Sequence, residues 1–148
     1  MDEQWMAEAL AEARLAGEEG EVPIGSVVVF EGKIVGRGRN ARERLYDPTA
    51  HAEILALQEA ARTLRRWRLT GATLYATLEP CFMCAGALVN ARVDRLVFAV
   101  ADPKAGAAGS LVDVPGDPRL NHRLEVSSGV LSADCGDLLR SFFRARRK

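Results

Sequence analysis

Long hydrophobic runs are missing from this sequence, and neither sign of charge is in excess. The longest apolar run, around residues 27–30, is far shorter than the roughly 20 residues that cross a bilayer, so we expect no membrane-spanning helix. The 148 residues carry 20 basic and 20 acidic side chains, and 48% of them are hydrophobic. This composition is typical of a folded globular chain and not of a disordered or fibrous one. We expect residues 1–148 to form a single domain.

Cysteine and histidine are scarce, with three and two residues respectively. An odd number of cysteines argues against a disulfide framework and leaves metal binding, catalysis or packing as their roles. Residues 1–20 are acidic and alanine-rich, and they lack the basic start and apolar centre of a secretory signal. We therefore expect a cytoplasmic protein.

The charges are distributed unevenly along the chain, although they sum to zero. Residues 1–21 hold seven acidic groups against the single Arg14, whereas residues 140–148 hold five basic groups and no acid. A second basic cluster lies at 62–68. Two interpretations remain open: these segments bind a local anionic partner, or they are solvated helix ends whose dipole favours cations.

Hydrophobic periodicity and turn residues divide the chain into helices and strands. We predict helices at 2–17, 49–64, 80–91 and 132–146, and strands at 24–30, 33–38, 72–78, 94–100 and 124–130. Asp47 or Thr49 is expected to cap the second helix, and Pro80 suits the first turn of the third. The turn at 31–32 joins the first two strands into a hairpin, so we expect an α/β domain with helices on both faces of one mixed sheet.

Cys81 and Cys84 form a C-x-x-C motif where a predicted strand runs into a helix. Their spacing places both on one face of the helix, whose dipole and free N–H groups favour the thiolate form that binds metal. The pair is therefore half of a site for zinc or a similar cation. A redox-active pair is the alternative, but it is expected near a thioredoxin-like start and without a histidine partner.

His51 and Glu53 supply the other half of this candidate site. Residues two apart do not face each other within a helix, so they serve one pocket only at a helix mouth, where the turn at 47–49 places them. His51 offers a nitrogen ligand and is poorly placed at a helix start to stay cationic. Glu53 is expected beside the metal without binding it.

The number of ligands indicates an open site. Three protein ligands leave a fourth tetrahedral position for water, as in catalytic zinc sites. His122 and Cys135 lie in no ligand-spaced motif, and we interpret Cys135 as a core residue. Zinc brings the pKa of its water toward neutrality, and Glu53 can take that proton and return it to a leaving amine. These residues predict hydrolytic deamination with one Zn²⁺ per subunit.

The H-x-E and P-C-x-x-C motifs together resemble the zinc-dependent nucleobase deaminases, and among them the bacterial tRNA adenosine deaminases. The resemblance covers almost the whole chain and is most specific at 21–25, Asn40, 47–53, 78–87, 102–110 and 121–122. It implies a three-layer α/β/α cytidine-deaminase-like fold. It also implies conversion of adenosine to inosine at the wobble position of an arginine tRNA anticodon, by a homodimer that binds the anticodon loop across both subunits.

The resemblance implies a role for each matching residue. The implied zinc ligands are His51, Cys81 and Cys84, and Glu53 is the implied proton shuttle. The implied substrate contacts are Val22 and Pro23 as apolar walls, Asn40 on the flipped-out nucleotide, Ala52 in the H-x-E motif, Asp102 on the ribose or backbone, and Phe143, Arg144 and Arg146 on the RNA loop.

Simpler interpretations of these residues stay open. Asn40 and Asp102 suit turns, and 22–23 suits the start of a strand. Phe142 and Phe143 fall on the apolar side of the last predicted helix with Leu138 and Leu139. Adjacent residues cannot both face the core, so one phenylalanine is free to stack on a base.

Departures from the family pattern, which bear on loop recognition, are Tyr46, Arg140, Ser141 and the turn at 115–118.

Two competing functions share parts of this pattern. A deaminase of free bases or nucleotides, such as guanine or a cytosine compound, would carry the same metal motif. The basic segment 140–148 favours RNA, because its side chains can meet phosphates. A non-catalytic, zinc-stabilised RNA-binding subunit is disfavoured by Glu53, since a structural site uses four ligands and needs no carboxylate there. The sequence implies no membrane and no protein partner beyond the second copy.

Overall fold

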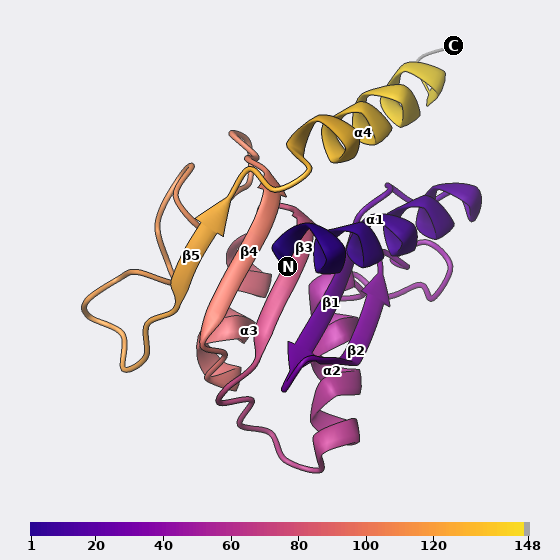
Figure 1. Ribbon diagram of the computed structural model, residues 1–148. Helices are drawn as coiled ribbons and strands as arrows, with labels where there is room; N and C mark the ends of the chain where they lie inside the picture. Colours follow the sequence, from indigo (N-terminus) through magenta and orange to yellow (C-terminus); the bar gives the residue numbers. More distant parts are fainter. Residues whose placement is uncertain (147–148) are drawn as a thin grey trace.

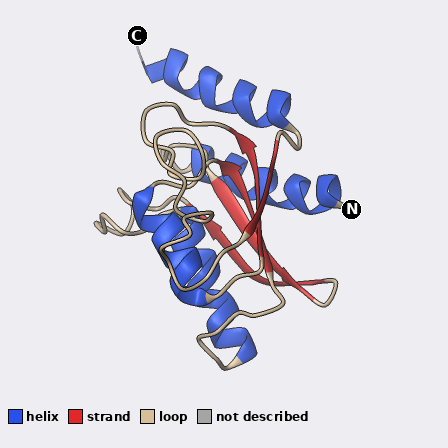
Figure 2. Cartoon of the chain, turned by 90° about the vertical axis from the view of Figure 1, so that its left-hand side faces the viewer, coloured by secondary structure: helices blue, strands red, loops and turns tan. Residues whose placement is uncertain are grey.

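The computed structural model describes residues 1–146, which form one five-stranded sheet with helices on both faces (Figures 1 and 2). In chain order the elements are α1 (Asp2–Glu18), β1 (Gly25–Phe30), β2 (Lys33–Arg39), α2 (Ala52–Leu64), β3 (Thr73–Leu78), α3 (Phe82–Ala91), β4 (Arg95–Val100), β5 (Glu125–Ser128) and α4 (Ser132–Arg146). The strand order is β2-β1-β3-β4-β5. β1 pairs antiparallel with β2 and β3, whereas β3, β4 and β5 run parallel. The predicted α/β class and mixed sheet are confirmed.

Two apolar layers fill the spaces on either side of the sheet. Adjacent strand residues point to opposite faces, so Val28 packs with the α2 and α3 side and Val27 with the α1 side. Leu74 and Leu96 belong to the first layer, and Met6 to the second. The view along the sheet shows the resulting α/β/α sandwich (Figure 2). No helix of residues 1–146 has the length and apolar character needed to cross a bilayer.

The starts of α2 and α3 lie later than the sequence predicted. α2 begins at Ala52 and not at Thr49, because His51 is extended, with φ −79° and ψ 152°. Asp47 Oδ1 accepts hydrogen bonds from the N–H and hydroxyl of Thr49 at 2.8 and 2.7 Å, which closes a separate turn before the helix. The predicted caps of α2 are therefore wrong. Cys81 is likewise extended before α3, so His51 and Cys81 both sit immediately before a helix.

The close approach of α2 to β2 depends on a glycine. A Cβ atom at Gly38 would lie 2.1 Å from the carbonyl oxygen of Ala52 and 2.7 Å from the nitrogen of Ala56. A side chain at Gly38 would therefore push away the first turn of α2. Gly38 thus allows the first turn of α2, which carries Glu53 and follows His51, to pack directly against β2.

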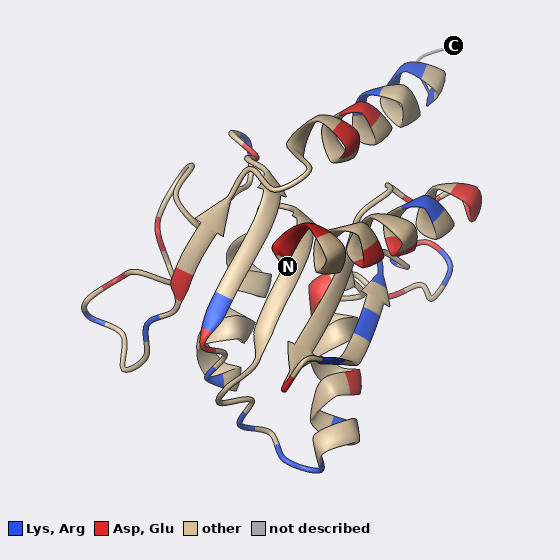
Figure 3. Cartoon of the chain, in the orientation of Figure 1, with Lys and Arg blue, Asp and Glu red and all other residues tan. Residues whose placement is uncertain are grey.

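α4 extends beyond the sheet, and its last turns carry arginines, as the charge view shows (Figures 1 and 3). Only Cys135 and Gly136 are fully buried in it. Phe142 is half-buried, but 45% of Phe143 is exposed, so Phe143 does not belong to the predicted apolar side. The Arg146 guanidinium lies 4.7 Å from the centre of the Phe142 ring and donates to the Gly20 carbonyl. Residues 147–148, part of the predicted basic segment, lie outside the described residues.

Candidate active site

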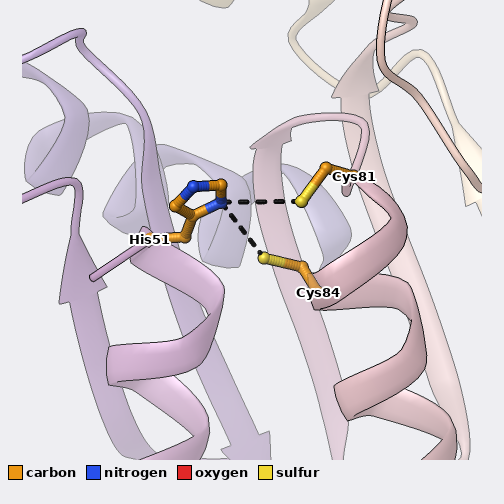
Figure 4. A group of neighbouring side chains, drawn as sticks. All are labelled: His51, Cys81 and Cys84. Atoms are coloured by element: carbon orange, nitrogen blue, oxygen red, sulfur yellow. Dashed lines mark hydrogen bonds between the residues drawn. The ribbon is translucent and has the colours of Figure 1, made fainter. Parts of the chain in front are cut away.

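The side chains of His51, Cys81 and Cys84, at the starts of α2 and α3, point toward one another (Figure 4). His51 Nδ1 lies 3.6 Å from Cys81 Sγ and 3.5 Å from Cys84 Sγ, and all the ligand atoms lie within 4.8 Å of one another. Zinc bonds of about 2.0 Å to nitrogen and 2.3 Å to sulfur at a tetrahedral angle would separate these atoms by about 3.6 Å. The three residues that the sequence singled out therefore form a group with the chemistry and spacing of a zinc site.

The electrostatics of this group also suit a cation. Hydrogen bonds with Cys84 and then His51 lower the pKa of the Cys81 thiol to about 3, although burial opposes them. The neighbouring Cys81 and burial raise the pKa of Cys84. The hydrogen bond with Cys81 raises the pKa of His51, whereas the start of a helix alone would lower it. A bound cation would replace the protons that these three side chains share.

Glu53 is the second residue of α2, and only 4% of it is exposed. Burial disfavours its charged form and raises its pKa to about 7. Its carboxyl group is a neighbour of Cys84 and shares a pocket with His51 and Cys81. A carboxyl group that titrates near neutrality can both accept and return a proton.

A small pocket of about 130 Å³ lies over these groups. Its lining residues are Ile24, Asn40, Arg42, His51, Ala52, Glu53, Leu78, Glu79, Cys81, Asp102 and Ala105. This volume is well below the roughly 300 Å³ at which pockets for drug-sized ligands begin, so it suits a group the size of one base. The Asn40 amide donates to the Val22 carbonyl and accepts from the Arg42 N–H, both at 3.3 Å, which fixes the Asn40 side chain in the pocket wall.

A larger groove of about 990 Å³ lies between α4 and the segment after β4. It shares Leu78 and Asp102 with the small pocket, so the two cavities adjoin. The predicted substrate residues Val22, Asp102, Phe143, Arg144 and Arg146 line it, together with Lys104 and Arg140. The groove therefore combines an apolar floor with basic side chains.

The structure assembles most of the predicted residues but not all of them. Pro23 is fully buried, and the neighbouring Ile24 lines the small pocket in its place. His122 Nε2 lies 2.7 Å from the Val93 carbonyl oxygen, and Cys135 belongs to the core beneath α4, as predicted. Pocket residues that sequence reasoning missed are Ile24, Arg42, Leu78, Glu79 and Ala105. Ile24, Leu78, Glu79 and Ala105 lie in the segments where the family resemblance is most specific, and this was the available signal.

Comparisons with known proteins agree with this geometry. The MafB19-like deaminase family matches residues 1–147. A tRNA-specific adenosine deaminase of Bacillus subtilis (strain 168) is 52% identical over 147 residues, which cover 99% of this chain and 91% of that protein. A solved structure from studies of A-to-I editing by tRNA:A34 deaminases at the wobble position of transfer RNA has a TM-score of 0.89 and 45% identity, over 92% of this chain and 99% of that one.

A more distant neighbour acts on a free base. The guanine deaminase from Nitrosomonas europaea has a TM-score of 0.82 and 27% identity, over 95% of this chain and 83% of that one. In this chain the H-x-E and P-C-x-x-C motifs, which are the signature of the nucleobase deaminase class, lie at two helix starts beside a mixed sheet. Within this class, the chain belongs to the family of tRNA-specific adenosine deaminases.

Proposed function

We propose that the protein converts adenosine to inosine at the wobble position of a tRNA anticodon by hydrolytic deamination. The observation that carries this proposal is the pair of adjoining cavities. A base-sized pocket over His51, Cys81 and Glu53 opens beside a larger groove with basic side chains. Base and RNA backbone can therefore be held by separate but neighbouring surfaces.

His51, Cys81 and Cys84 would hold one Zn²⁺ in each subunit. When bound, zinc supplies a Lewis acid that lowers the pKa of water. Glu53 takes a proton from the attacking water as its oxygen adds to C6 of adenine. Glu53 passes this proton to N1 of the ring, then takes the second proton from the added oxygen and delivers it to the departing amine, so the C6–N bond breaks and ammonia leaves. Water and adenosine give inosine and ammonia, and Glu53 returns to its starting state.

The remaining pocket residues would orient the base. The Asn40 amide lies next to the pocket and can exchange a backbone partner for a polar edge of the nucleotide. Ala52 and Ile24 contribute apolar walls of the pocket, and Val22 contributes an apolar wall of the adjoining groove. Asp102 reaches both cavities, which suits a contact to the ribose or backbone between base and loop.

The groove would bind the anticodon loop. Phe143 offers an exposed aromatic face on which a base can stack, and Arg144 and Arg146 offer charge to phosphates. The family resemblance supports an arginine tRNA as the substrate and a homodimer that binds the loop across both subunits. We also propose that residues 1–148 form one zinc-dependent deaminase domain, which works in the cytoplasm, where tRNA is used.

The test offers the protein five substrates separately: arginine tRNA, its anticodon stem-loop, adenosine, cytidine and guanine. Mass spectrometry then measures inosine in digested RNA and the deaminated free products. We expect inosine from both RNAs, and none from a stem-loop whose wobble adenosine is replaced by guanosine. Deamination of guanine without any inosine in RNA would instead support a free-base enzyme like the neighbour from Nitrosomonas europaea.

A further inference from the structure

We propose that Glu79 is a positioning residue that holds the 102–110 loop so that Asp102 and Ala105 close the small pocket. This inference rests on the proposed function, because it assigns Glu79 a part in binding the target nucleotide. Glu79 follows β3 immediately and is only 3% exposed. Its backbone N–H donates to the Val100 carbonyl at the end of β4, so the start of the loop is fixed to the sheet.

Both carboxylate oxygens of Glu79 are occupied by donors from this one loop. Oε1 accepts from the N–H of Asp102 at 3.0 Å and from the hydroxyl of Ser110. Oε2 accepts from the N–H groups of Ala108 and Ser110 at 2.9 and 3.0 Å. None of the ion pairs among residues 1–146 includes Glu79. The buried charge is therefore satisfied by loop donors, and loss of the carboxylate leaves them unpaired.

The loop wraps closely around the carboxylate. A Cβ atom at Gly106 would lie 2.3–2.5 Å from the Glu79 carboxyl group, so the backbone is in direct contact with it. The N–H of Ala107 also donates to the Pro80 carbonyl at 2.8 Å, next to Cys81. The middle of the loop is thus held against the segment that leads to a metal ligand.

The same loop carries two walls of the pocket. Asp102 Oδ1 accepts from the N–H groups of Lys104 and Ala105 at 3.0 and 3.2 Å, so these residues form one compact turn. Asp102 and Ala105 line the pocket that contains Glu53. Fixing the nitrogen of Asp102 through Glu79 therefore fixes the position of that wall.

Another acidic residue gives a matched control at the far end of the sheet. Asp2 accepts from Arg95 at 2.9 and 2.7 Å and from the Tyr75 hydroxyl at 2.7 Å, and so ties α1 to the start of β4. The variant Asp2→Asn removes a carboxylate of comparable connectivity without touching the pocket. It should lower the melting temperature and leave KM unchanged.

The experiment is a double-mutant cycle on the zinc-loaded protein, with Glu79→Gln, Asp102→Ala and the double variant. Kinetics on the anticodon stem-loop, zinc content and melting temperature are measured for each. Glutamine keeps the shape but turns an NH₂ group toward N–H donors. We expect Glu79→Gln to raise KM about tenfold with a smaller change in kcat, and to raise it less than twofold when Asp102 is already alanine. Zinc content should stay at one per chain.

Additive effects on KM, or an unchanged KM in Glu79→Gln, would overturn the inference. Loss of zinc in this variant would do so too, because Glu79 would then support the metal ligands and not the loop. Hydrogen exchange gives a readout that needs no substrate: exchange should speed up in Glu79→Gln at 102–110 and not at 52–64. Uniform or absent changes would refute the loop contact. If the wild-type protein makes no inosine from the stem-loop, the proposed function fails separately.

Discussion

The floor and the rim of the site are built differently. The floor consists of His51, Glu53, Cys81 and Cys84, which come from two neighbouring helix starts; Glu53 and Cys84 are buried, and His51 and Cys81 are half-buried. The rim comes from segments far apart in the chain, among them Val22, Ile24 and the last turns of α4, whose side chains are exposed or half-buried. A preorganised, buried floor suits bond breaking, whereas an open rim suits recognition of a large partner. We therefore expect floor changes to act on turnover or metal content, and rim changes to act on RNA binding.

The largest effect is expected for Glu53→Gln. Removing the proton shuttle should lower kcat by about 10²–10⁴-fold, the usual contribution of general acid–base catalysis, with KM and zinc content close to wild type. Steady-state kinetics on the stem-loop and metal analysis of the same preparations measure this. Glu59→Gln on the exposed side of the same helix is the control and should keep full activity. Turnover of Glu53→Gln within fivefold of wild type would contradict the proposed role.

The next effect concerns the metal. Cys84→Ser removes a sulfur ligand. Mutation of a residue that only hydrogen-bonds a metal ligand already lowers metal affinity by about 10–100-fold, so loss of a ligand itself should lower zinc affinity by more than tenfold. Competition with a chelator, followed by metal analysis and a melting curve, gives the result. Cys135→Ser changes a buried cysteine outside the site and should lower stability while keeping zinc. Equal zinc retention in the two variants would remove Cys84 from the ligand set.

The same contrast explains what the sequence revealed. The floor could be predicted because its residues form two short motifs, and each motif places its ligands through the local geometry of a helix start. The exact start of α2 could not be predicted, since Asp47 suits both a helix cap and a closed turn with Thr49, and the two look alike in sequence. The sheet order was not predicted either, because strand pairing depends on long-range packing.

The rim was predicted only as far as the family resemblance reached. Periodicity cannot distinguish Pro23, which is buried, from Ile24, which lines the pocket, because both lie in one apolar run. Glu79 meets Ser110 across 31 residues, and nothing local in the sequence marks this contact. Phe143 was placed on the apolar side of α4, although the core ends before the last turns of that helix.

The smallest and most specific effect is expected at Arg144 in the rim. Its guanidinium has one hydrogen bond within residues 1–146, a long contact of 3.4 Å to the Ser141 hydroxyl, so its charge is available to a phosphate. Arg144→Ala should weaken stem-loop binding a few-fold and reduce the slope of log Kd against log salt by about 0.7–1, with kcat nearly unchanged. Arg144→Lys should keep the slope, since the slope depends on the number of positive charges at phosphates and lysine keeps one there. Arg119→Ala, which removes an exposed arginine paired with Asp117, should change neither quantity. If Arg144→Ala keeps the wild-type slope, Arg144 makes no phosphate contact, and the charge that the groove offers RNA comes from Lys104, Arg140 and Arg146.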